Sequence, residues 1–167
     1  MYNKGDNVIY GSKGVCVIED ITTVPFENAP KDKMYYVLFV ISNESKIYVP
    51  VDIADSRMRK VLDKTDAKEL IKKIPSIEPI EIRNEKQLED VYKNAMHTND
   101  SVEWIRLIKC IHSRRQQRLS QGKQMTSLDK KYMDIAEDAL YLELGTALGI
   151  EKGAVLDLIL KEAENNK

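Results

Sequence analysis

Residues 34–50 read Met34-Tyr35-Tyr36-Val37-Leu38-Phe39-Val40-Ile41-Ser42-Asn43-Glu44-Ser45-Lys46-Ile47-Tyr48-Val49-Pro50, two apolar runs around a short polar one. β-branched and aromatic residues favour strands, and a short polar connection between two such runs indicates an antiparallel hairpin. Further short apolar runs precede it at residues 7–10 and 14–18, where the glycines of Gly11-Ser12-Lys13-Gly14 permit a tight reversal. Four or five short strands predict a small, strongly bent antiparallel sheet or barrel, with an exposed loop over residues 25–30.

The second part of the chain has a different periodicity. From about Val61 the apolar residues recur every three or four positions, which is typical of helices. Pro75-Ser76-Ile77-Glu78-Pro79 interrupts this pattern, because the residue before a proline avoids helical dihedral angles. The sequence therefore predicts an α+β fold, with a small antiparallel β domain over residues 1–58 followed by an all-helical bundle of four or five helices over residues 59–167.

The charge of the chain is unevenly distributed. The 167 residues carry 26 basic and 27 acidic side chains, yet residues 106–131 alone have a net charge of +7 and residues 132–167 a net charge of -5. A basic cluster is what a phosphate backbone attracts, because each contact releases condensed counterions. The same cluster also fits a solvated helix face whose charges pair with the acidic C-terminal stretch. The basic residues are Arg106, Lys109, Arg114, Arg115, Arg118, Lys123, Lys130 and Lys131.

Several classes of protein lack support in the sequence. No apolar run is long enough to span a bilayer and the first residues lack an apolar leader, so we expect a cytoplasmic protein with no membrane partner. Cys16, Cys110, His97 and His112 do not have metal-ligand spacing or the neighbours of a catalytic triad. We therefore expect no enzyme, and with it no catalytic residue, metal, cofactor or small-molecule substrate.

The first residues resemble a known family. Tyr2-Asn3-Lys4-Gly5-Asp6-Asn7-Val8-Ile9-Tyr10-Gly11-Ser12-Lys13-Gly14-Val15 is similar to the start of the CarD/CdnL family of bacterial transcription regulators, and of the matching module in transcription-repair coupling factor. The resemblance continues through Tyr36-Val37-Leu38 and Ile47-Tyr48-Val49-Pro50-Val51. In the helical part, residues 113–120 resemble the arginine-rich helix end of the family, and Leu140-Tyr141-Leu142-Glu143-Leu144 resembles its late L-x-x-E-L helix.

This resemblance implies a fold and a function. It implies a Tudor-like N-terminal domain that binds the β subunit of RNA polymerase and a helical domain that contacts promoter DNA beside the transcription bubble. The polymerase-binding candidates lie on the matching late strand and are Ser45, Lys46, Ile47 and Tyr48. Core packing is the equally weighted alternative for Ile47. The cationic candidates for DNA contact are Arg83, Lys86, Arg114, Arg115, Arg118, Lys123 and Lys130.

The sequence departs from the family at one position. The family places a tryptophan near the start of the first helix after the linker, where it wedges against the minor groove, and residues 80–86 contain none. The only tryptophan, Trp104, lies on an apolar helical stripe, which favours core packing over a wedge. Aliphatic side chains form wedges in other minor-groove binders, so Ile80 and Ile82 are the candidates for a minor-groove wedge in this chain.

Together these patterns predict a non-enzymatic transcription regulator that binds RNA polymerase through its first domain and modulates promoter opening through its second. The alternative is an adaptor of RNA polymerase without direct DNA binding, in which the +7 segment meets an acidic protein surface. Salt dependence separates the two, because phosphate contacts weaken steeply as salt rises.

Overall fold

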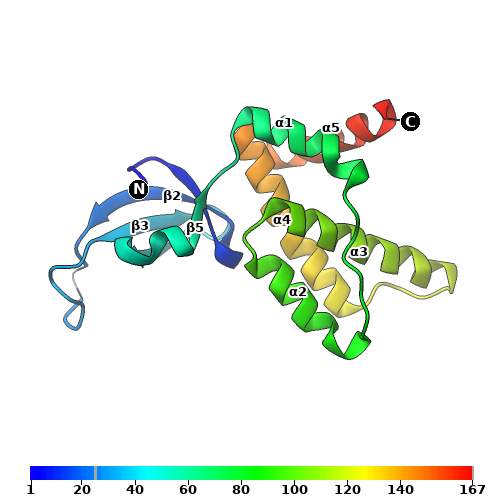
Figure 1. Ribbon diagram of the computed structural model, residues 1–167, viewed down its shortest axis with the longest axis horizontal. Helices are drawn as coiled ribbons and strands as arrows, with labels where there is room; N and C mark the ends of the chain where they lie inside the picture. Colours follow the sequence, from blue (N-terminus) through cyan, green and yellow to red (C-terminus); the bar gives the residue numbers. More distant parts are fainter. Residues whose placement is uncertain (25, 167) are drawn as a thin grey trace. The chain divides into compact units, whose positions relative to one another are not determined.

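The computed structural model describes residues 1–24 and 26–166 and divides into two compact units, which meet in the chain between Val61 and Leu62 (Figure 1). The first unit is a five-stranded antiparallel sheet with the strand order β4-β3-β2-β1-β5, so that β4 and β5 are its edges. Its strands are β1 (Asn7–Tyr10), β2 (Val15–Thr22), β3 (Tyr35–Val40), β4 (Ser45–Pro50) and β5 (Met58–Lys60).

One face of this sheet carries the apolar core of the unit. Alternate residues of β2 and β3 are fully or almost fully buried there, as expected for strands with a period of two. The N-terminal arm closes the core, because the Tyr2 hydroxyl donates to the carbonyl of Met58 at 2.9 Å and the Tyr2 ring meets Tyr36 edge to face. The core residues are Tyr2, Val8, Cys16, Ile18, Tyr36, Leu38, Val40, Val49, Ala54 and Met58.

A β-bulge interrupts the pairing of β2 with β3. Ile18 pairs with Leu38 and Asp20 pairs with Val37, so Glu19 is the extra residue. An extra residue shifts the alternation of side chains by one position. As a result Ile18 lies in the core, whereas Glu19 and Asp20, although consecutive, both line the opposite face of the sheet.

The connections in this unit are short, apart from the one between β2 and β3. Gly11–Lys13 forms a single 3-10 turn, which confirms that the glycine-containing segment is a reversal between strands. Val51–Ser56 forms a second 3-10 helix before β5. Of the loop predicted over residues 25–30, residue 25 lies outside the described residues, and residues 26–30 contain neither helix nor strand.

The second unit is helical. Its helices are α1 (Lys64–Lys73), α2 (Leu88–His97), α3 (Ser101–Ser120), α4 (Ser127–Leu148) and α5 (Lys152–Asn165), with 3-10 turns at Ile74–Ser76 and Glu85–Gln87. Three of the helices begin at a side-chain cap: Asp63, Asp100 and Thr126 each accept a hydrogen bond from a backbone N–H of the first turn.

The core of the helical unit is built mainly from α2, α3 and α4. Trp104, Leu107 and Ile111 are fully buried at helical spacing on α3, which confirms the apolar stripe that the sequence predicts there. Trp104 is consequently a core residue in this structure. Both cysteines are buried and reduced, and burial raises the pKa of the Cys16 thiol to about 12.

The α+β fold class is confirmed, with the β part first and the helices after it. The first domain was predicted to end at residue 58, whereas Met58–Lys60 pairs with β1 and so belongs to the sheet. Among the described residues, no helix has both the length and the apolarity needed to cross a membrane.

Gly145 allows α5 to pack closely against α4. A Cβ atom at this position would lie 2.8 Å from the carbonyl oxygen of Ile150, a backbone atom that cannot move without shifting the turn. We expect Gly145→Ala to lower the free energy of unfolding by about 1–3 kcal/mol, the usual cost of overpacking. The measurement is urea denaturation followed by the fluorescence of Trp104.

Gly153 provides a matched control for this substitution. It also lies in a helix, near the start of α5, but a Cβ atom there meets nothing within 4 Å. Gly153→Ala should therefore be neutral or stabilising by up to about 1 kcal/mol. Equal destabilisation by both changes would contradict the close approach at Gly145.

Candidate functional site

The β4 edge of the sheet is the first candidate surface, because β4 pairs only with β3. The backbone N–H of Val51 donates to the carbonyl of Met34 at 3.0 Å, and the register of β3 with β4 continues from that pair. Hydrogen-bonded pairs alternate along an antiparallel ladder, so Ile47 and Val49 direct their amides toward β3, whereas the Ser45 N–H donates to the side-chain oxygen of Asn43 at 3.1 Å. Lys46 and Tyr48 direct their backbone N–H and C=O groups away from β3.

The side chains of β4 follow the same alternation. Ile47 packs against the core cluster, which confirms the packing alternative for this residue, and Lys46 and Tyr48 are exposed on the other face. Lys46 forms a 2.7 Å ion pair with Glu19, whose hydrogen bond raises the pKa of the Lys46 ammonium. Ser45 begins the strand, where its hydroxyl donates to the side-chain oxygen of Asn43 at 2.7 Å.

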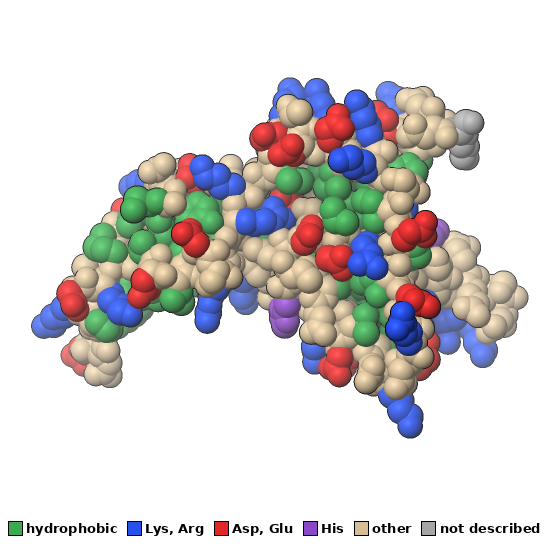
Figure 2. Space-filling model, viewed as in Figure 1, with side chains coloured by type: hydrophobic (Ala, Val, Ile, Leu, Met, Phe, Trp, Pro, Cys, Tyr) green, Lys and Arg blue, Asp and Glu red, His purple; other side chains and the backbone are tan. Residues whose placement is uncertain are grey.

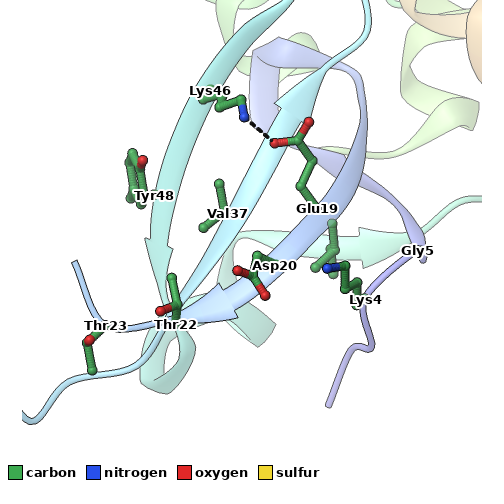
Figure 3. A pocket seen from close by; sticks show the side chains of 10 residues that line it. Lys4, Gly5, Glu19, Asp20, Thr22, Thr23, Val37, Lys46 and Tyr48 are labelled. Atoms are coloured by element: carbon green, nitrogen blue, oxygen red, sulfur yellow. Dashed lines mark ion pairs between the residues drawn. The ribbon is translucent and has the colours of Figure 1, made fainter. Parts of the chain in front are cut away.

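An open groove of about 730 Å³ lies beside this edge, on the face opposite the core (Figure 3). Figure 3 shows Lys46 and Glu19 joined across the groove, with Asp20 following Glu19 on β2 and Val37 on β3 between β2 and β4. The bulge in β2 accounts for the two adjacent carboxylates in the groove. The groove thus combines a free strand edge, an apolar floor at Val37 and charges of both signs.

An exposed aromatic pair extends this surface. The ring of Phe26, 58% exposed, meets the ring of Tyr48, 37% exposed, edge to face with centroids 5.5 Å apart. Large exposed aromatic side chains beside an unpaired edge are typical anchors of protein–protein interfaces. Figure 2 shows hydrophobic side chains of the sheet unit exposed in several areas, with charged side chains between and around them.

The basic residues of α3 do not form one surface. Arg106 and Lys109 donate to backbone carbonyls of residues 74–78, and Arg106 also forms a 2.8 Å ion pair with Glu103. These two cations therefore hold the chain segment before α2. Their role in the fold accounts for part of the +7 charge of residues 106–131.

Arg114 belongs to a partly buried network. Its guanidinium forms ion pairs with the fully buried Asp129 at 3.2 Å and with Glu85 at 2.7 Å, and the side chain is 20% exposed. The Tyr92 hydroxyl donates to Asp129 at 2.7 Å. Burial works to lower the pKa of the Arg114 guanidinium, but the hydrogen bond to Glu85 and the charge of Asp129 outweigh it and raise that pKa. The structure thus turns Arg114 inward, away from the other candidate cations.

The cationic candidates from Arg115 to Lys130 lie near the tip where α3 passes into α4. Arg118 donates to the carbonyl of Gln124 at 2.7 Å, Arg115 and Lys123 are exposed, and Lys130 pairs with Asp134 at 3.0 Å in the first turns of α4. Figure 2 shows basic side chains beside this hairpin end, at the right of the view. We call these four residues the tip cations.

A hollow of about 340 Å³ lies beside two of the four tip cations. Its lining includes two cations, Arg115 and Lys130, and three apolar side chains, Leu119, Met125 and Met133. The carboxylates of Asp134 and Glu137 also line it. Leu119, one of the apolar side chains that line the hollow, is 46% exposed. Burial and the nearby Asp134 and Asp138 raise the pKa of Glu137, which weakens the negative charge in this hollow as pH falls.

The candidates before α2 lie along an extended segment. Ile80 and Ile82 are half-buried, and the Ile80 backbone N–H donates to the carbonyl of Arg106 at 3.2 Å. Arg83 is 86% exposed and forms a 3.5 Å ion pair with Glu81. Lys86 is exposed in the 3-10 turn that precedes α2. This segment carries a cation and two aliphatic side chains but is distinct in sequence from the tip.

Sequence reasoning missed two exposed side chains of these surfaces. Phe26 is the only aromatic residue in the segment between β2 and β3, and that isolation in a polar loop was an available signal. Leu119 continues the sequence of α3 beyond its buried stripe. Within residues 1–24 and 26–166, no three histidine, cysteine or acidic side chains converge in a way that could hold a metal ion.

Comparison with known proteins identifies the first unit. Residues 2–62 match a family model described as the CarD-like/TRCF RID domain, which confirms the resemblance over this part of the chain. The comparison with curated proteins gave no match. The resemblance of the helical part remains a prediction.

Proposed function

Because residues 2–62 are a CarD-like/TRCF RID domain, a module that interacts with RNA polymerase in transcription, we propose that this chain is a non-catalytic regulator that docks on the polymerase β subunit and contacts promoter DNA to modulate open-complex formation. Docking on the polymerase is supported by one observation, the free β4 edge that lies beside an exposed aromatic pair. A partner strand can extend the sheet at such an edge, with main-chain bonds giving affinity and side chains giving specificity.

The helical unit carries the DNA half of the proposal. Arg115, Arg118, Lys123 and Lys130 offer phosphate contacts at the tip, and such contacts position a protein on the duplex without reading its sequence. Arg83 and Lys86 add cations on the segment before α2, next to Ile80 and Ile82. Arg114 is absent from our proposed surface, because Asp129 and Glu85 already neutralise it.

Attachment to the polymerase allows this small number of cations to bind promoter DNA. Four to six phosphate contacts give weak binding at physiological salt on their own. Because both units belong to one chain, docking of the first raises the effective concentration of the second at the promoter, into the millimolar range for a short connection. The proposal therefore predicts weak DNA binding by the free chain and stronger binding on the polymerase–promoter complex.

The test is a salt titration with a charge-neutralised tip. We expect the triple change Arg115→Gln, Lys123→Gln and Lys130→Gln to weaken binding to forked promoter DNA, with polymerase present, by about tenfold or more near 0.1 M salt. The slope of log affinity against log salt should fall by about 3, one unit for each lost phosphate contact. Fluorescence anisotropy of labelled DNA measures both quantities.

The matched control removes the same charge elsewhere on the helical unit. Lys64, Lys68 and Lys72 are exposed on α1, and their change to glutamine should leave the slope unchanged. Equal effects of the two triple variants would show that only net charge matters and contradict a tip contact. Wild-type binding to polymerase without any measurable DNA contact would favour the adaptor function instead.

A further inference from the structure

Residues 77–84 form neither helix nor strand, and the first of them are hydrogen-bonded to α3. Lys109 donates from its ammonium to the carbonyl of Ile77 at 2.6 Å and also to the carbonyl of Ile74. One helical turn earlier, Arg106 donates from Nε to the carbonyl of Glu78 at 3.2 Å. Figure 1 shows this stretch running past α3 between the end of α1 and the start of α2.

The backbone of α3 adds a further bond. The Ile80 N–H donates to the carbonyl of Arg106 at 3.2 Å, so the same residue holds the segment through its side chain and its main chain. Glu103, one turn before Arg106, fixes the guanidinium with a 2.8 Å ion pair. The segment is thus bound at four of its residues, Ile74, Ile77, Glu78 and Ile80, by Arg106 and Lys109, which lie about one turn apart on α3.

The main-chain carbonyl groups of this segment require hydrogen-bond donors. The carbonyls of Ile77 and Glu78 lie outside helix and strand, where no regular main-chain pattern supplies a donor, and Pro79 prevents the chain from continuing as a helix there. Lys109 and Arg106 supply charged donors, which form stronger hydrogen bonds than neutral ones. Partial burial lowers the pKa of the Lys109 ammonium, consistent with a cation that faces protein carbonyls more than water.

Holding the segment at Ile80 also restrains the residues immediately after it. Ile82 and Arg83 are the next side chains along the extended chain, with Ile82 half-buried and Arg83 exposed. A loop that is ordered before binding loses less conformational entropy when it meets its partner. The contacts at Ile77, Glu78 and Ile80 therefore act on the residues that carry the proposed DNA contact before α2.

We propose that Arg106 and Lys109 are positioning residues, which latch residues 74–80 to α3 and thereby present Ile82 and Arg83 to promoter DNA in a preordered conformation. This inference rests on the proposed function for its DNA partner. In this proposal Arg106 and Lys109 hold the segment in place and do not contact phosphate. Phosphate contact comes from Arg83, Lys86 and the tip cations.

The experiment compares Lys109→Met with Lys109→Arg in the full-length chain. Methionine keeps an unbranched side chain but removes all donors, whereas arginine keeps a charged donor and should rescue. In the free protein we expect amide hydrogen exchange over residues 77–84 to become at least several-fold faster in Lys109→Met, with α3 and α4 unchanged. Unchanged exchange in this segment would overturn the latch, whatever the protein does on DNA.

The second readout is binding to forked promoter DNA in the presence of RNA polymerase. Lys109→Met should weaken affinity about fivefold while leaving the salt slope at its wild-type value, because no phosphate contact is lost. A slope lowered by about 1 would make Lys109 a direct contact and overturn the positioning role. If wild type and Lys109→Met bind DNA equally well, the positioning role is wrong but the proposed function stands. If wild type does not bind DNA, the proposed function is wrong, and so is the positioning role that depends on it.

Discussion

Replacing Lys46 by proline is expected to reduce binding of the full-length chain to RNA polymerase by about a hundredfold or more. The Lys46 N–H points away from β3, so proline removes a donor that a partner strand would use without removing a bond of the β3–β4 ladder. Proline is tolerated on edge strands for this reason. Biolayer interferometry with immobilised polymerase measures the loss, and circular dichroism checks that the sheet is retained.

Lys46→Ala is the matched control for this substitution. It removes the same ammonium and the same ion pair with Glu19 but keeps the backbone N–H. Exposed ion pairs contribute little to binding or stability, so alanine should weaken polymerase binding only a few-fold. Similar losses for proline and alanine would place the effect in the side chain, and strand pairing at β4 would then be wrong.

The largest effect on stability is expected from Asp129→Asn. Asp129 is fully buried, pairs with Arg114 at 3.2 Å and accepts from Tyr92 at 2.7 Å. Removing one partner of a buried ion pair leaves the other charge in a poor environment, which typically costs about 3–5 kcal/mol. Urea denaturation followed by Trp104 fluorescence is the appropriate measurement, because the only tryptophan of the chain lies in the core of the helical unit.

Two further variants measure how much Tyr92 and Glu85 contribute to the free energy of unfolding through this network. Tyr92→Phe removes one hydrogen bond to a charged acceptor and should cost about 1.5–3 kcal/mol. Glu85→Gln alters the exposed arm of the network, where the carboxylate is 69% exposed, and should cost less than about 1 kcal/mol. If Asp129→Asn were no more destabilising than Glu85→Gln, the buried pair would not be a main support of the bundle.

The elements that arise from local patterns could be predicted from the sequence. Strand propensity and turn residues predicted β1, β3 and β4 over their whole lengths and β2 over its first half. These signals act between residues close in the chain. A glycine does not by itself predict the end of a helix, because Gly153 lies inside α5, where a glycine costs only about 1 kcal/mol relative to alanine.

The arrangement of the cations could not be predicted from their number. Arg114 meets Asp129, fifteen residues away, and Glu85, twenty-nine residues away, and a count of charges contains no information on such distant pairs. One signal was available, since Arg114 lies seven residues after Leu107 and so continues a buried face of α3. The bonds of Lys109 gave no such signal, because its partners are main-chain carbonyls that any residue provides.

The two ends of β4 have a consequence for the behaviour of the protein in a crowded cell. Glu44, with a φ of 57°, turns the chain sharply just before the strand, and Pro50, which has no N–H, ends it. Only the outward amides of Lys46 and Tyr48 can then donate to another strand, and a lysine on the edge repels an identical lysine. Short, charged, proline-terminated edges discourage aggregation. The strand is consequently open to a complementary partner yet a poor template for fibril growth by copies of itself.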